Sequence, residues 1–135
     1  DNAVPHLLSD ADIRLAFEQF YRCITPGGGC MLSVRDYAAM ELGGQRLYPR
    51  LTHATPDGRI VLFDLWEFEG SFYNITTYVV EDQGQPIAQT HVIRGGRYYC
   101  VNIATLENLL AQAGFGQVKT LRDRFFQPLI VGTKE

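Results

Sequence analysis

The sequence predicts a mixed α/β fold, and three observations lead to this prediction. Apolar residues recur at helical spacing over residues 13–24, and a Pro-Gly-Gly turn and a short apolar strand follow. Three strand-like segments then succeed one another over residues 59–94, separated by turn residues. A second helical pattern and two strand patterns close the chain. Helices that alternate with strands favour a layered α/β domain.

The first helix is expected to begin at Ser9, because its hydroxyl and the Asp12 carboxylate can satisfy free amides of the first turn. Its apolar stripe consists of Ile13, Ala16, Phe17, Phe20, Tyr21 and Ile24. Pro26 and the glycines after it end the helix. The strand that follows, residues 31–34, stops abruptly at the polar sequence Arg35-Asp36-Tyr37.

The middle of the chain is expected to be an antiparallel meander of three strands. Residues 38–55 show no clean period and predict a loop, with a short helical turn at residues 37–42. The three strands are expected at residues 59–68, 72–81 and 87–94, and Gly95-Gly96 is expected to end the third. Both faces of the first two strands carry apolar residues, so cover on one side and at least partial cover on the other is expected.

The last third of the chain predicts a helix and two strands. Asn102 can cap a helix with a buried stripe of Leu106, Leu109, Leu110 and Ala113 that ends at Gly114. Residues 116–121 and 126–133 are typical of strands. Pro128 favours an edge or a bulge for the second of them.

Composition sets limits on function. The chain has 135 residues, 46% hydrophobic and 20% charged, which is typical of one globular domain with a modest core. A net charge of −3 disfavours nucleic-acid binding, and the apolar runs are too short to predict a membrane span. Three widely spaced cysteines predict neither a disulfide framework nor a zinc site, and favour the cytoplasm. The start, without Met or a lead-in strand, suggests a piece of a longer protein.

The polar end of the strand at residues 31–34 is the most informative candidate site. Arg35 offers two-pronged recognition of a carboxylate, and Tyr37 adds a hydroxyl. A surface ion pair is an equally good interpretation of this spacing. Asn2 and His6 flank Pro5 and offer polar groups at another strand end, with a solvated terminus as the favoured alternative.

Other motifs carry less chemistry. The glycines at residues 27–29 lack the Lys-Ser/Thr of a phosphate loop, and His91 is expected to be a satisfied residue of the core or a sheet face. Ordinary packing is favoured over a cation-binding wall for the aromatic residues Trp66, Tyr73, Tyr78, Tyr98 and Tyr99. Neither paired catalytic carboxylates nor a nucleophile motif are present, and no catalytic or metal-binding residue is predicted.

Several segments together resemble the carboxyl-terminal half of class I S-adenosylmethionine-dependent methyltransferases. They are Pro-Gly-Gly at residues 26–28, Leu-Leu-Ala-Gln-Ala-Gly-Phe at 109–115 and Phe-Gln-Pro-Leu-Ile-Val-Gly at 126–132. The opening residues 1–7 resemble the loop after the fourth strand of that family. Residues 2–6 together with Val34-Arg35-Asp36-Tyr37 are similar to the glycine/sarcosine N-methyltransferase group.

The resemblance implies the carboxyl-terminal half of a Rossmann-like sheet with an inserted three-stranded antiparallel lid. Residues 1–37 and 101–135 would form the partial core and supply strands five, six and the antiparallel strand seven. Residues 38–100 would form the lid over the substrate pocket. The implied activity is methyl transfer to a small molecule, such as the amine of glycine or sarcosine, which relies on positioning and desolvation rather than a catalytic base.

The resemblance also assigns roles to individual residues. Asn2, Arg35 and Tyr37 would bind the substrate and its carboxylate. Asp1, Asn2 and His6 would lie near S-adenosylmethionine. The family's glycine-rich loop and ribose-binding acid are missing, so this chain alone is expected to bind the methyl donor weakly and to be inactive. A separate or preceding amino-terminal half would then be its partner.

Two interpretations from other classes stay open at this point. The meander and helices can form a pocket that binds a small ligand without catalysis. Alternatively, the chain is a dimerising domain, because the strand at residues 31–34 would have an unpaired edge, and such edges recruit partners. A homo-oligomer is therefore expected.

Overall fold

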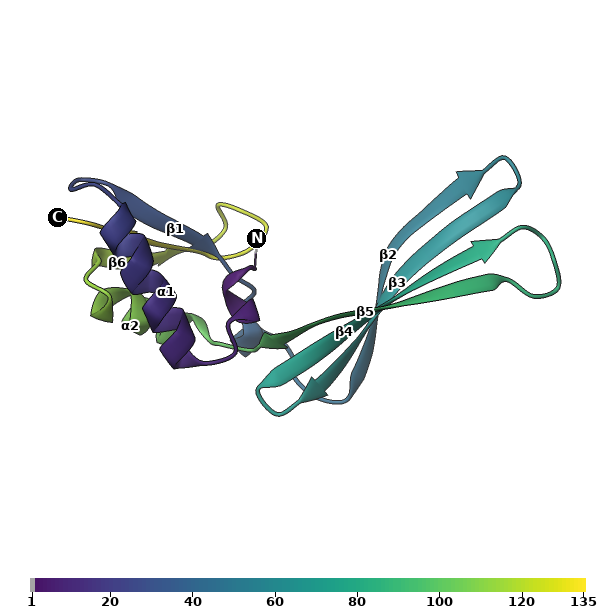
Figure 1. Ribbon diagram of the computed structural model, residues 1–135, viewed down its shortest axis with the longest axis horizontal. Coiled ribbons are helices and arrows are strands. Elements are labelled where there is room, and N and C mark those ends of the chain that lie inside the picture. The colour runs from purple at the N-terminus through teal and green to yellow at the C-terminus, as the bar shows by residue number, and fades with distance from the viewer. Residues whose placement is uncertain (1) are drawn as a thin grey trace. The chain divides into compact units, whose positions relative to one another are not determined.

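The structure, a computed structural model, describes residues 2–135, and the chain divides into two compact units (Figure 1). Unit 1 comprises Asp1–Glu41 and Tyr98–Glu135, and unit 2 comprises Leu42–Arg97. Strand β5 (Gln89–Tyr99) runs from the second unit into the first.

Unit 1 contains a small sheet with two helices packed together. Its elements are η1 (Val4–His6), α1 (Asp10–Cys23), β1 (Gly29–Ser33), η2 (Tyr37–Ala39), α2 (Ile103–Gln112), β6 (Gly116–Leu121) and β7 (Leu129–Thr133). The sheet order is β1-β7-β6, and the last strand, β7, runs antiparallel to both of its neighbours. Helix α2 packs on β6 and β7, and α1 packs against α2.

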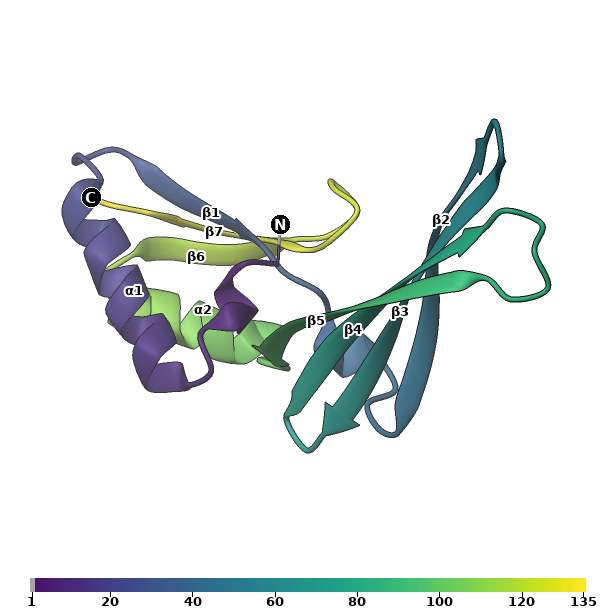
Figure 2. The same ribbon diagram turned by 45° about the vertical axis from the view of Figure 1, so that its right-hand side comes forward.

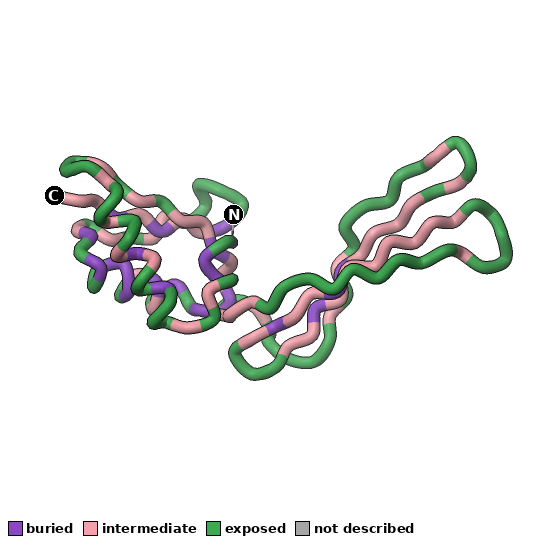
Figure 3. Tube along the Cα trace, in the orientation of Figure 1, coloured by how far each residue is buried: buried purple, intermediate pink, exposed green. Residues whose placement is uncertain are grey.

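The core of unit 1 follows from the two apolar stripes expected in the sequence. Ile13 and Phe17 of α1, Leu106 and Leu110 of α2 and Ile130 of β7 are all completely buried (Figure 3). Burying side chains of this size contributes roughly 1.5–3 kcal/mol each to folding. These few residues therefore hold the helices on the sheet.

Both predicted helix starts are confirmed. The Ser9 hydroxyl accepts the backbone N–H of Asp12 at 3.1 Å, and the Asn102 side chain accepts that of Thr105 at 2.8 Å. Each cap satisfies an amide that has no partner inside its helix and stabilises the helix by about 1 kcal/mol.

Unit 2 is a single antiparallel sheet with the order β2-β3-β4-β5 (Figure 2). Its strands are β2 (Gln45–Thr55), β3 (Gly58–Glu69), β4 (Phe72–Asp82) and β5. The sheet thus has four strands, where three were expected. Its buried residues are few and are Asp64, Trp66, Tyr73 and Thr76 among those that the structure describes.

Two sequence predictions in this region were wrong. Residues 45–55 form a strand rather than a loop, because β2 is an edge strand with mostly exposed side chains and shows no apolar period. Pro49 lies at an irregularity in the pairing with β3, which an edge tolerates. Strand β5 runs through Gly95-Gly96, since Gly95 approaches the Ile75 carbonyl so closely that a Cβ atom there would lie 2.8 Å from its oxygen.

Two further findings concern His91 and the last strand. His91 lies outside the core: its side chain is 49% exposed and its Nε2 lies 3.4 Å from Oε1 of Glu81, which agrees with the alternative of a partnered residue on a sheet face. The last strand begins at Leu129, because the segment from Arg122 to Pro128 forms a loop of bends.

Candidate functional site

The candidate site lies at the carboxyl end of β1. The strand ends at Ser33, and the completely buried Val34 follows, with its N–H donating to the Pro128 carbonyl at 3.2 Å. The chain then leaves the sheet at Arg35. A buried anchor directly before a polar segment fixes where that segment starts.

Asn2 forms hydrogen bonds with three residues of this segment. Its backbone N–H donates to the Ser33 carbonyl at 3.1 Å, its Oδ1 accepts the Arg35 N–H at 3.0 Å, and its Nδ2 donates to the Tyr37 hydroxyl at 2.9 Å. Asn2 is 5% exposed and has φ of +38°, a left-handed conformation that asparagine tolerates better than most residues. The expectation of a solvated terminus at Asn2 was therefore wrong.

The structure thus brings Asn2, Arg35 and Tyr37 to one place, but with different exposure. Tyr37 is 2% exposed, whereas Arg35 is half-buried. A hydroxyl that accepts a hydrogen bond from an amide keeps its own proton for donation. In this arrangement Asn2 and Tyr37 form a buried polar framework, and Arg35 is the least buried of the three.

Asp36, between these residues, forms a further connection. Its Oδ2 accepts a hydrogen bond from Nη1 of Arg122, in the loop after β6, at 2.6 Å. This carboxylate raises the pKa of the Arg122 guanidinium, chiefly through the hydrogen bond. Asp36 and Arg122 line a cavity of about 520 Å³ together with Ala38, Asn102, Ile103, Ala104, Glu107 and Thr120.

His6 lies apart from the hydrogen bonds of Asn2. It ends the short helix η1, is exposed, and packs against Tyr98 with ring centroids 4.2 Å apart and the planes tilted by 47°. The next residue, Tyr99, donates its hydroxyl to Oδ1 of Asp10 at 3.0 Å. Burial first, and then Asp10, raises the Tyr99 pKa. Asp1, the remaining predicted site residue, lies outside the described residues.

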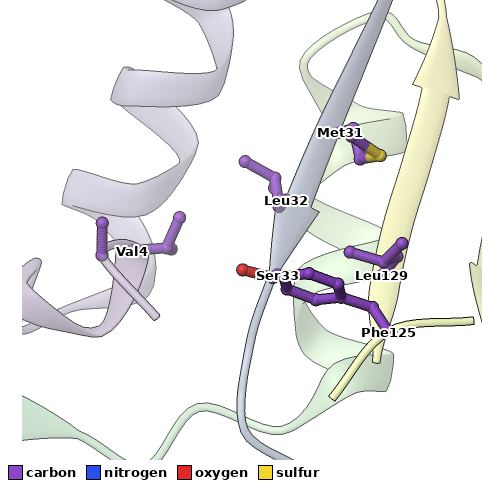
Figure 4. Close-up of a pocket in the computed structure, with 7 residues that line it drawn as sticks. Val4, Met31, Leu32, Ser33, Phe125 and Leu129 are labelled. Atoms are coloured by element: carbon purple, nitrogen blue, oxygen red, sulfur yellow. The ribbon is translucent and has the colours of Figure 1, made fainter. Parts of the chain in front are cut away.

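A second cavity, of about 330 Å³, lies alongside β1 (Figure 4). Its lining is mostly apolar and consists of Ala3, Val4, Met31, Leu32, Ser33, Phe125 and Leu129. Figure 4 shows Val4 facing Leu32 across the cavity and Phe125 beside Ser33 at the end of the strand. Phe125 was not among the site residues predicted from the sequence. The sequence feature that could have indicated it is a pair of phenylalanines in a charged turn. Both are at least half exposed, Phe125 at 50% and Phe126 at 70%.

The metal-binding groups, the cysteines and the helices add no further candidate site among the described residues. Within residues 2–135 no group of three or more His, Cys, Asp or Glu side chains is placed to hold a metal ion. The three cysteines are free, and burial raises the pKa of Cys30 and takes that of Cys100 to about 11. These two thiols are therefore poor nucleophiles at neutral pH. The described helices are all too short or too polar to cross a membrane.

The fold is similar to about half of the fold of several solved methyltransferase structures. It has the mixed α/β architecture of S-adenosylmethionine-dependent methyltransferases of known structure, as the comparison of the whole chain shows. No protein-family model matches the sequence, and no curated protein matches it.

Three structures illustrate the likeness. CalS10 of Micromonospora echinaspora, an amino pentose methyltransferase with bound S-adenosylmethionine, superposes with a TM-score of 0.82 at 14% identity. DesVI of Streptomyces venezuelae gives 0.79 at 14%, and the sugar N-methyltransferase KedS8 of Streptoalloteichus gives 0.76 at 12%. All of this chain is covered, but only 56%, 56% and 53% of the three proteins. The chain therefore spans little more than half the length of these proteins.

Proposed function

We propose that this chain is the substrate-side portion of an S-adenosylmethionine-dependent methyltransferase that acts on a small-molecule amine. One observation carries the proposal. The whole chain, which has the antiparallel β7 between β1 and β6 and a four-stranded sheet before α2, superposes on CalS10, a methyltransferase with bound S-adenosylmethionine. At 14% identity this likeness concerns the fold, and the activity is our inference.

The partner we propose is the amino-terminal half of the same enzyme. Strand β1 is an edge of its sheet, and the mostly apolar cavity beside it lies open. The hydrogen bond from the Asn2 N–H to the Ser33 carbonyl has the position of one rung between β1 and a neighbouring strand. A strand that continues from this rung would cover the edge and bring the missing glycine-rich loop with it. A second copy of this chain is the alternative occupant, which would give a homo-oligomer.

The residues near the end of β1 fit a sulfonium methyl donor. An aromatic face attracts a cation, and His6 with Tyr98 forms an accessible aromatic pair. We therefore assign His6 to the donor side of the site. The proposed place of Asp1 and Asn2 there rests on the sequence resemblance, and the buried Asn2 would act by holding the backbone of Arg35. S-adenosylmethionine would supply an activated methyl group, and the main task of the protein is to hold a neutral amine in line with it and exclude water. The free cysteines favour action in the cytoplasm.

Two substrate subclasses compete. Arg35 favours an amino acid such as glycine or sarcosine, because a guanidinium binds a carboxylate with two parallel hydrogen bonds. The described substrates of CalS10 and KedS8 favour an amino sugar. Labelled S-adenosylmethionine offered to the full-length gene product with each candidate amine will separate them. Calorimetric titration of the donor tests the class itself, and the absence of any heat would overturn it.

Arg35→Ala in the full-length gene product tests the role of the candidate site. We expect KM for a carboxylate substrate to rise roughly 10- to 100-fold, the size of a lost charge-assisted hydrogen bond, while donor affinity stays within twofold. Arg22→Ala, at an exposed position of α1, is the matched control and should change neither constant. A collapse of donor affinity in the Arg35 variant would show that this residue is misassigned.

A further inference from the structure

The segment Arg35-Asp36-Tyr37 is held from two directions by residues far away in sequence. Asn2 holds Arg35 by its backbone and Tyr37 by its hydroxyl. Arg122 holds Asp36, which lies between them, at 2.6 Å. The segment therefore has an anchor from the chain before α1 and another from the loop after β6.

The Arg122–Asp36 pair is poorly suited to a role in global stability. The Arg122 side chain is 57% exposed and that of Asp36 is 21% exposed. Exposed pairs of this kind are screened by water and salt and stabilise proteins very little. The backbone beside the pair is nevertheless unusual, because Asp123 adopts a left-handed φ of +58°. A local role at the end of β1 explains the pair better than a contribution to the core.

The backbone couples Asp36 closely to Arg35. The Tyr37 N–H donates to the Arg35 carbonyl and the Ala39 N–H donates to the Asp36 carbonyl, both at 3.0 Å. A displacement of Asp36 in such a tight turn moves Arg35 as well.

We propose that Arg122 is a positioning residue, which holds Asp36 so that the Arg35 guanidinium is presented to the substrate. This inference rests on the proposed methyltransferase function and on the role of Arg35 in it. Neither Arg122 nor Asp36 contacts the reacting atoms in this scheme. Their effect appears in substrate affinity and leaves methyl-donor affinity and the chemical step unchanged.

Steady-state kinetics of the full-length gene product test the proposal. In Arg122→Ala we expect KM for the amine substrate to rise about 3- to 5-fold, the upper range for an exposed pair, with kcat and donor affinity within twofold of the parent. Arg122→Lys should recover part of the loss. The matched control is Arg14→Ala, which removes a pair of similar length and exposure (2.7 Å, 50% and 29%) on α1 and should leave KM unchanged.

A double-mutant cycle separates positioning from independent effects. If Arg122 acts through Asp36, Arg122→Ala combined with Asp36→Ala should raise KM no further than the larger of the two single changes. Hydrogen exchange at the amides of residues 35–39 should become faster in Arg122→Ala and stay unchanged in Arg14→Ala. Additive effects on KM, or unchanged exchange, would overturn the proposal.

The outcomes also distinguish this inference from the function on which it rests. A parent protein that binds no S-adenosylmethionine and transfers no methyl group overturns the proposed function, and the positioning role with it. A parent that transfers methyl groups, together with an Arg122→Ala variant of unchanged KM, overturns the positioning role alone.

Discussion

Units 1 and 2 are stabilised in different ways. The buried apolar side chains of unit 1 come from its two α-helices, strand β7 and the segments that connect these elements, and several are completely buried. In unit 2, only Trp66 and Tyr73 among the described apolar residues are buried. The comparison shows that unit 1 has an interior of its own, whereas unit 2 depends on strand pairing and on aromatic contacts across one face.

Those aromatic contacts form a continuous cluster. Trp66 stacks on Tyr73 with ring centroids 4.7 Å apart, and Tyr48 and Phe68 contact the same tryptophan at 4.3 and 6.3 Å. Aromatic pairs contribute about 0.5–1.5 kcal/mol each beyond the area they bury. The cluster therefore supplies part of what a helix layer supplies in unit 1.

The largest expected effect tests whether unit 1 has this independent core. Leu110→Ala removes a completely buried side chain of α2 and should destabilise unit 1 by about 2–5 kcal/mol. Both described α-helices belong to unit 1 and the single tryptophan belongs to unit 2. Urea unfolding followed by far-UV circular dichroism and by Trp66 fluorescence therefore reports the two units separately.

The control for this change is Leu47→Ala in β2, at a side chain that is 61% exposed. This change should lower the free energy of unfolding by less than about 0.5 kcal/mol, whichever signal is followed. If Leu110→Ala shifted both transitions equally, the two units would unfold as one and the contrast between them would fail.

The difference between the units also explains what the sequence could predict. Helix α1 was predictable because its stripe and its Ser9 cap both depend on local sequence, and the same holds for α2 with Asn102. Strand β2 was not, because an exposed edge strand needs no apolar alternation and Pro49 argues against a strand. Its pairing with β3 is a tertiary contact that overrides the local pattern.

The candidate site shows the same limit. Arg35 and Tyr37 follow an apolar strand in the sequence, so their location just after the end of β1 was predictable from position alone. The two anchors were not, because Asn2 is 35 residues away from Tyr37 and Arg122 is 86 residues away from Asp36. The Arg122–Asp36 pair follows from the sheet order, which places the loop before β7 beside the end of β1.

A second prediction tests how far unit 2 depends on close pairing of its strands. A Cβ atom added at Gly58 would lie 1.9 Å from the Asp82 carbonyl oxygen, and that backbone cannot rotate away like a side chain. Gly58→Ala should therefore lower the free energy of unfolding that Trp66 fluorescence reports by roughly 1–3 kcal/mol, the usual range for overpacking. Gly70→Ala, with φ of +57° and open space, should cost only about 1 kcal/mol. Equal costs would show that β3 can move away from β4.

The smallest expected effect concerns the pH dependence of unit 2. The pKa of Asp82 is lowered first by the backbone N–H of Gly84 and then by Arg59, whose Nε lies 2.9 Å from the carboxylate. A carboxyl whose pKa is lower in the folded state stabilises the fold above its unfolded pKa of about 3.9, and this contribution is lost as the pH falls below that value.

Asp82→Asn removes the titrating group and so checks this sign. The variant should be less stable than the parent at neutral pH, and the gap should close in acid, because Asp82 of the parent is then protonated. The Trp66 transition should record this small change, and the helical signal of unit 1 should not. A gap that persists unchanged at low pH would mean that the side chain acts by packing rather than by charge. If the stability difference between parent and variant appeared equally in the helical signal, the two units would unfold as one.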